Sequence, residues 1–241
     1  MNPTERAPYS PRRSKKLLSL LSPPETASGK SWHAEYEIAM LWPNFARFDE
    51  KINSRAGGRL VLDYSPGKLK VDHLNLAHPR DAEHLTAEVL CRNDALATLL
   101  EWQYTSRFDK KPDPERMTGL HENCVIKDRV FYREGKPSAT LSPGAACTSD
   151  YSLFCAMSGF SKDWKLPQNF DMLEALTTLR RDQKFKKTGI GTLSDGRAFT
   201  EVVQWGTGIL PWFWWLDSNG FPIACIREHQ AFLLQKFGGL S

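Results

Sequence analysis

The chain has 241 residues, 41% of them hydrophobic, and a formal net charge of +4 from 32 basic and 28 acidic residues. This length and composition support one domain with a substantial core, or two domains at most. No stretch approaches the roughly 20 apolar residues of a membrane-spanning helix, so we expect no such span.

All of the excess positive charge lies in residues 1–31, and the remaining chain, residues 32–241, is neutral. The first segment is rich in Pro, Ser and Arg and has little to bury, so we expect a disordered basic arm when it is alone. Its basic groups could lie on an acidic or lipid-headgroup surface, direct the chain to the nucleus or another organelle, or bind nucleic-acid phosphates, and we favour the first. The residues expected to contact a partner are Arg6, Arg12, Arg13, Lys15 and Lys16.

Alternating large and charged residues predict an antiparallel meander after the arm. Residues 32–38 alternate as a half-buried strand does, and the Arg-Ala-Gly-Gly sequence at 55–58 is expected to break the chain. Residues 59–64 and 68–73 flank a Ser-Pro-Gly sequence, which predicts a hairpin.

The middle of the chain is less regular. Residues 83–102 fit either an amphipathic helix or two strands joined at Asn93-Asp94, and we favour strands because they continue the meander. Residues 110–119 are expected to form a Pro-rich loop, and residues 123–133 a strand with a kink at Lys127-Asp128.

A helix is predicted at residues 169–181, after a Ser/Pro/Gly-rich loop at 138–150. Asn169 or Asp171 would cap the helix, and two arginines would suit its C-terminal end. Met172, Leu173, Leu176 and Leu179 would form its apolar face.

The last part of the chain has the clearest strand pattern. Its predicted elements are a tight Asp-Gly turn at 194–197, a strand at 199–205, a break at 206–211, an aromatic strand at 212–216, a turn at 217–220 and a strand at 221–226. The whole chain is therefore expected to be mainly β, with a curved antiparallel sheet or half-barrel and one helix packed on it.

Several of these segments resemble the curved-sheet family of ependymin-related proteins and LolA-like lipoprotein carriers. The matching parts are residues 58–64 with 68–72, Leu166-Pro167, residues 188–191, residues 195–197 with Trp205, and residues 214–217 with 220–223. The resemblance implies a half-open barrel around a helix, with a concave face that binds apolar ligands. Because this chain lacks a signal peptide and a clear cysteine pattern, the resemblance carries over neither secretion nor disulfides.

Two clusters have the residue types of a chemical site but the wrong spacing. His73, His78 and His84, with Asp72 and Asp81, match no common zinc pattern, so we expect no metal site.

His121 and Cys124 could form a nucleophilic pair, but on a strand they would point to opposite faces. The glycines at 189 and 191 precede no helix, so a phosphate-binding loop is not expected and a strand is. No cofactor is predicted.

The cysteine count is five, and no secretion signal accompanies it. Free buried thiols are therefore favoured over a disulfide framework. A local disulfide between Cys147 and Cys155 stays open for an oxidising compartment.

Aromatic residues crowd the strand at 212–216. On a strand these residues lie on both faces of the sheet. One face could pack in the core while the other contacts a partner, a lipid or an apolar ligand. We favour the alternative in which both faces pack in the core. The residues assigned to such an interface are Trp205, Trp212, Phe213, Trp214 and Trp215.

From the sequence we expect a non-catalytic accessory subunit of a large organellar assembly, such as a mitochondrial membrane complex. It would dock on protein subunits, or on lipid headgroups, through its arm and aromatic strand. The alternatives are a carrier of a lipid or other apolar ligand, a cytoplasmic location, and an enzyme that uses Cys124 or His73.

Overall fold

The computed structural model describes residues 11–26, 30–41, 52–76, 82–109, 119–158, 167–227 and 229–240. Arg6, His78 and Asp81, which figure among the predicted sites, lie outside these residues, and so does most of the predicted Pro-rich loop.

A single 15-stranded sheet and three short helices make up the described part of the chain. The helices are η1 (Pro11–Arg13), α2 (Lys15–Leu20) and α3 (Asp150–Met157). The strands before α3 are β1 (Trp32–Leu41), β2 (Ile52–Ser65), β3 (Lys68–Asn75), β4 (Ala82–Cys91), β5 (Leu99–Asp109), β6 (Gly119–Lys127), β7 (Val130–Arg133), β8 (Lys136–Thr140) and β9 (Cys147–Ser149). Those after α3 are β10 (Gln168–Glu174), β11 (Thr178–Thr192), β12 (Ala198–Trp205), β13 (Trp212–Leu216), β14 (Pro222–Arg227) and β15 (Gln230–Gly238).

The strand order shows two meanders that meet at the first and last strands. From β1 the chain runs outward to the edge strand β8, crosses to the other edge at β9, and runs inward from β10 to β15. Strands β1 and β15 then pair antiparallel, from His33 opposite Gly238 to Met40 opposite Gln230. Only the β9–β10 pair is parallel among the described strands.

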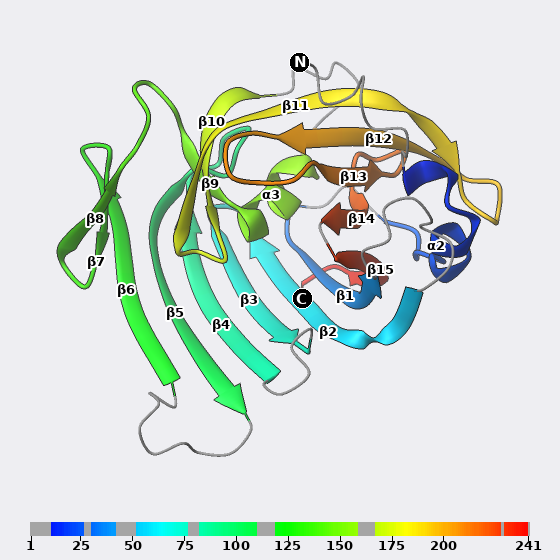
Figure 1. Ribbon diagram of the computed structural model, residues 1–241, viewed down its shortest axis with the longest axis horizontal. Helices are drawn as coiled ribbons and strands as arrows, with labels where there is room; N and C mark the ends of the chain where they lie inside the picture. The colour runs from blue at the N-terminus through cyan, green and yellow to red at the C-terminus, as the bar shows by residue number, and fades with distance from the viewer. Residues whose placement is uncertain are drawn as a thin grey trace.

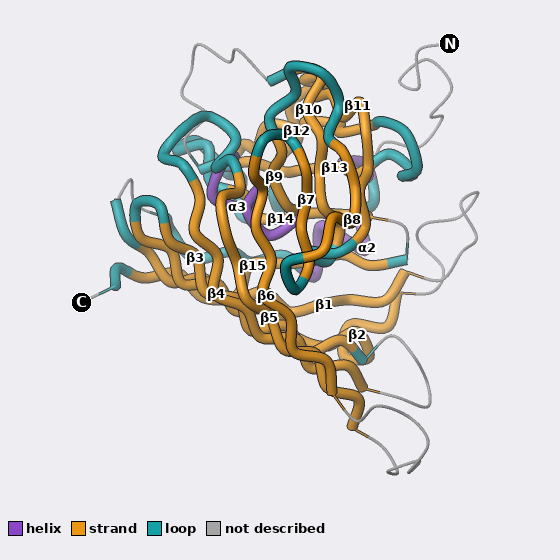
Figure 2. Tube along the Cα trace, turned by 90° about the vertical axis from the view of Figure 1, so that its left-hand side faces the viewer, coloured by secondary structure: helices purple, strands orange, loops and turns teal. Residues whose placement is uncertain are grey.

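The sheet curls until its β9 edge approaches β5. Thr148 of β9 donates a hydrogen bond to the Leu96 carbonyl, just before β5, at 2.7 Å. Figure 1 shows β2–β6 as one curved layer, with β10–β12 passing along the opposite side. Figure 2 shows the same arrangement from the side. Strands β6–β8 extend beyond the point of closure.

The interior of the curled sheet is filled by α3 and large aromatic residues. All eight residues of α3 are buried, and the Ser149 side chain caps the helix by accepting from the Ser152 N–H. The Phe154 ring lies 4.9 Å from the Tyr36 ring and 5.0 Å from the Trp214 ring, between centroids. Apolar groups of both meanders are thereby removed from water around one helix.

The described part of the N-terminal arm covers one end of the curled sheet. Leu17 and Leu21 are buried in the core. Arg197, in the β11–β12 turn, donates to the Pro23 carbonyl at 2.6 Å, and Thr26 donates to Asp217, which follows β13, at 2.5 Å. Residues 11–26 are thus held against the rest of the chain, and their disorder when alone stays a prediction.

Arg12 fastens the arm to a buried carboxylate. Its Nη1 lies 3.3 Å from Oε1 of Glu201, whose side chain has no exposed area. The Trp215 indole N–H and the Thr188 hydroxyl donate to the same carboxylate. A Cβ on Gly189 would lie 2.4 Å from the Arg12 Nη1, so this glycine leaves room for the guanidinium.

The helix predicted at residues 169–181 is wrong. The segment forms β10 and the start of β11, joined at Ala175 and Leu176, which both have positive φ. The leucine and methionine spacing that resembles a helical stripe arises because β10 is buried on both faces from Phe170 to Leu173. The helix of the structure, α3, lies partly within the predicted 138–150 loop and beyond it.

Two smaller predictions are corrected in the first meander. Residues 55–58 do not break the chain but belong to β2, where the register with β1 shifts. The kink at Lys127-Asp128 is a two-residue hairpin turn, with Asp128 and Arg129 both at positive φ.

The remaining strand predictions are confirmed. The 59–73 hairpin is β2–β3, residues 83–102 are strands, and the C-terminal turns and strands lie where the sequence places them. No helix in the described residues has the length and apolarity needed to cross a bilayer.

The arm's anchor gives a testable stability effect. Replacing Arg12 with alanine removes a cation that touches the buried Glu201 carboxylate, which should lower the free energy of unfolding by about 3 kcal/mol. Denaturant unfolding measures this. The Lys15→Ala variant, in which an exposed arm lysine is lost, should unfold like the parent. Arg12→Ala with Glu201→Gln should recover much of the loss, and a single Arg12→Ala variant as stable as Lys15→Ala would contradict the assignment.

Candidate functional site

A pocket of about 430 Å³ opens at the end of the curled sheet opposite the arm. We call it the end pocket. It lies where β1, β3 and β14 end and where β4, β11 and β15 begin. Its polar lining residues include His73, Glu83, Asp150, Tyr151, Glu174 and Arg227, and Met40, Leu85 and Ala175 add apolar surface.

The pairing of strands and the start of α3 bring these side chains together. His73 of β3 stands opposite Leu85 of β4, and Glu83 stands opposite Asn75, so all four share the interior face of the sheet. The first turn of α3 adds Asp150 and Tyr151 from inside the curl.

Asp150 and Arg227 form a buried ion pair in the wall of the pocket. Arg227 Nη1 donates to Asp150 Oδ2 at 2.8 Å, and the two side chains are 14% and 2% exposed respectively. The Ala175 N–H donates to the other carboxylate oxygen, which holds the β10–β11 turn against α3. The pair thus joins three separate parts of the chain.

The Arg227 guanidinium is also enclosed by aromatic rings. Its central carbon lies 4.9 Å from the Trp212 ring centroid and 4.6 Å from that of Phe232. Burial lowers the pKa of Arg227, but the Asp150 carboxylate together with Cys225 and Tyr151 raises it more, so the pKa lies above its ordinary value. The guanidinium is therefore charged, paired with Asp150 and packed against two rings.

His73 is the least satisfied polar group of the pocket. Its Nδ1 lies 2.8 Å from the Tyr151 hydroxyl, whereas its buried Nε2 has no hydrogen-bond partner in the described residues. Burial first, and then the charges of Arg227 and His84, lower the pKa of His73 to about 3. The imidazole is neutral at physiological pH.

The hydrogen-bond pattern assigns the His73 tautomer. If Tyr151 donates its hydroxyl proton to Nδ1, both of those atoms are satisfied and Nε2 carries the ring proton. The opposite arrangement leaves both the Tyr151 proton and the Nε2 lone pair without a partner. We therefore assign Nε2–H as a donor that lacks an acceptor.

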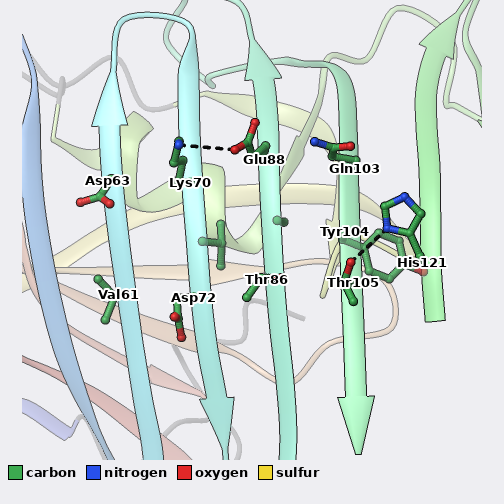
Figure 3. A pocket seen from close by; sticks show the side chains of 12 residues that line it. Val61, Asp63, Lys70, Asp72, Thr86, Glu88, Gln103, Tyr104, Thr105 and His121 are labelled. Carbon is green, nitrogen blue, oxygen red and sulfur yellow. Dashed lines mark hydrogen bonds and ion pairs between the residues drawn. The ribbon is translucent and has the colours of Figure 1, made fainter. Parts of the chain in front are cut away.

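A second hollow, of about 420 Å³, lies on the outer face of β2–β6. Figure 3 shows its side chains standing on the strands, with the Lys70–Glu88 ion pair at 3.4 Å and the Thr105–His121 hydrogen bond at 3.0 Å. Both interactions join neighbouring strands within the sheet surface. Among the described residues that line this outer hollow, no buried polar side-chain atom lacks a hydrogen-bond partner.

The arm residues predicted to bind a partner have different positions. Arg12 is engaged with Glu201 inside the chain, whereas Lys15 is exposed and Lys16 is half-buried. The side chain of Arg13 lies outside the described part.

The aromatic strand is core rather than surface. Trp212, Trp214 and Trp215 have no exposed area, because α3 fills the curl on one side of β13 and the arm covers the sheet near Trp215 on the other. Their assignment to an accessible interface is thus corrected. Phe213 and Trp205 are half-buried.

The cysteine and histidine candidates have different surroundings in the structure. All five thiols are free and buried in this structure, and the Cys147–Cys155 disulfide stays a prediction for an oxidising compartment. His121 bonds to Thr105 on the outer face, whereas Cys124 is buried on the inner one, where burial raises its pKa to about 12. No group of three metal-ligand side chains occurs within the described ranges.

Sequence reasoning missed most of the end pocket. It singled out His73 only as a metal or catalytic candidate and gave no role to Glu83, Asp150, Tyr151, Glu174 or Arg227. The available signal was Asp150 at the start of a continuous apolar run, which could have marked a helix N-terminus buried in a core.

The comparisons with known proteins support the fold. No protein-family model matches the chain, and neither does any curated protein sequence. One similar solved structure is a beta-barrel-like protein of domain of unknown function DUF1849 from Brucella abortus. It is 11% identical, the match covers 88% of this chain and 98% of that one, and the TM-score is 0.51.

At this identity the likeness concerns the fold alone. The chain has a mainly β, barrel-like fold with a curved antiparallel sheet, as the sequence predicts. The curved-sheet part of the resemblance is thus supported, without its ependymin-related or LolA-like name.

The unsatisfied imidazole predicts an unusual result for one double variant. Replacing both His73 and Tyr151 with phenylalanine removes the hydrogen-bonded pair and the unpartnered Nε2 together, so the free energy of unfolding should rise by about 1 kcal/mol. Each single variant should be less stable than the double variant, because one partner is left unpaired. Denaturant unfolding tests this, and a double variant less stable than the parent would show that Nε2 is satisfied in solution.

Proposed function

We propose that this chain is a non-catalytic binding protein whose end pocket takes a small organic molecule with polar and apolar parts. The observation that carries the proposal is His73, a buried imidazole with an unpartnered Nε2 in the wall of a 430 Å³ pocket. A buried donor without a partner costs roughly 1–3 kcal/mol, and a ligand atom would recover part of that cost.

The filled interior argues against a long lipid chain on the concave face. That face is occupied by α3 and by the rings that pack around Phe154. A ligand bound in the end pocket would instead place a short apolar part against Met40 and Leu85. The LolA-like kinship and the lipid-carrier hypothesis stay predictions from sequence motifs.

The chemistry of the pocket favours binding over catalysis. A histidine with a pKa of about 3 is a weak base and does little as a general base at neutral pH. The thiols of Cys91, Cys124 and Cys225 have pKa values raised by burial to about 11, 12 and 12, so each is protonated at neutral pH and a poor nucleophile.

The subunit hypothesis, with protein or lipid-headgroup partners and a mitochondrial location, stays a prediction. Arg12 makes its contacts within the chain and the tryptophans of β13 are buried, so fewer residues can contact a partner than the sequence suggests. Within the described residues, Lys15, Lys16, Trp205 and Phe213 retain exposed surface for such a partner.

Blocking the end pocket tests the proposed function. Thr178 is an exposed residue in its lining, and a Thr178→Trp variant should fill part of the volume. The probes are isoamyl alcohol, isoamylamine and isocaproate, and ligand-observed NMR measures their affinities. At least one of them should bind the parent protein, and its affinity should fall about tenfold or more in the Thr178→Trp variant.

The matched control is Thr86→Trp, which replaces an exposed strand threonine of the outer hollow and should leave binding unchanged. Circular dichroism would establish that both variants are folded. A panel without any binder, or binding that Thr178→Trp leaves intact, would contradict the proposed function.

A further inference from the structure

The charges that line the end pocket do not balance. Asp150 is paired with Arg227 at 2.8 Å, and Glu174 is paired with Arg180, which lies outside the lining, at 2.6 Å. The half-buried Glu83 carboxylate accepts a hydrogen bond from the Ser106 hydroxyl at 2.8 Å and has no cation beside it in the described residues. Its negative charge therefore faces the pocket without compensation.

Neighbouring histidines do not supply the missing positive charge from inside the pocket. The His73 imidazole is neutral, and His84, on the other face of the sheet, contacts Asp72 at 3.1 Å. His229 lines the pocket from its exposed rim.

An anionic ligand fits this lining poorly. The guanidinium of Arg227 is already engaged by Asp150 and enclosed between two aromatic rings. An added carboxylate or phosphate would face Glu83 and Glu174, and like charges at short range are repulsive. A cation would instead be attracted to Glu83.

A second feature of the ligand follows from His73. Its Nε2–H lacks an acceptor, and a neutral carbonyl or hydroxyl oxygen would supply one without adding negative charge. The nitrogen has no exposed surface in this structure, so side chains of the pocket wall must shift for an acceptor to reach it.

We propose that the end pocket binds a small organic ammonium compound that also carries a neutral acceptor oxygen. The ammonium group meets Glu83, the oxygen accepts from His73 Nε2–H, and the apolar part lies against Leu85 and Met40. This inference rests on the proposed function and names the class of ligand.

Four probes of related shape separate the parts of this proposal. Leucinamide has the ammonium, the carbonyl and the branched apolar chain; isoamylamine lacks the carbonyl, isocaproamide lacks the ammonium, and isocaproate is an anion. Titration calorimetry or NMR should rank leucinamide first and isoamylamine second, with isocaproamide weaker and isocaproate weakest.

Two glutamates on opposite faces of β4 provide the matched variants. Glu83→Gln should weaken leucinamide and isoamylamine about tenfold or more and leave isocaproamide unchanged, because only the charge is removed. Glu88→Gln removes an exposed carboxylate of the outer face and should leave all four affinities unchanged. His73→Phe should weaken leucinamide several-fold and leave isoamylamine unchanged.

The outcomes distinguish this inference from the proposed function. The ammonium assignment would be overturned if isocaproate bound as tightly as isoamylamine, or if Glu83→Gln left the affinity for both amines unchanged. In either case, binding that Thr178→Trp still weakens would uphold the proposed function of the end pocket. Equal affinities of leucinamide and isoamylamine would overturn the acceptor assignment. Failure of every probe, including the uncharged ones, would overturn the proposed function as well.

Discussion

The structure depends on the pairing of β1 with β15. These strands are the first and the last of the sheet in sequence, yet they lie side by side in its middle and join the two meanders. Without their hydrogen bonds, each meander would be a separate sheet with an apolar face exposed to water. The pairing therefore converts two open layers into one curled sheet that can enclose α3.

Closure of the sheet produces two unlike ends. The arm covers one end with buried leucines and the Arg12–Glu201 pair. The other end collects the polar termini of strands and the first turn of α3, where side chains have fewer neighbours to satisfy them. The pocket at the polar end and the closed apolar end thus follow from one topology. The unpartnered His73 Nε2 lies at this polar end, where the proposed ligand would supply an acceptor.

The sequence predicted strands where turn residues were explicit. The Pro-Gly, Asp-Gly and Asn-Gly turns each gave a correct hairpin or strand boundary, because these residues restrict the backbone locally. The β10–β11 turn was missed since Ala175 and Leu176 reach positive φ only with tertiary support, including the Asp150 contact to the Ala175 N–H. The end pocket was unpredictable for the same reason, because β3, α3 and β14 approach one another only through closure of the sheet.

Strand β8 forms one edge of the sheet, and its composition affects whether another strand can pair with it. It is short and largely exposed, it contains Lys136 and Pro137, and its neighbour on one side is β7. Proline offers no N–H to an incoming strand, and a lysine charge opposes the approach of an identical edge. The composition of β8 therefore disfavours pairing of this edge with a second copy of the chain.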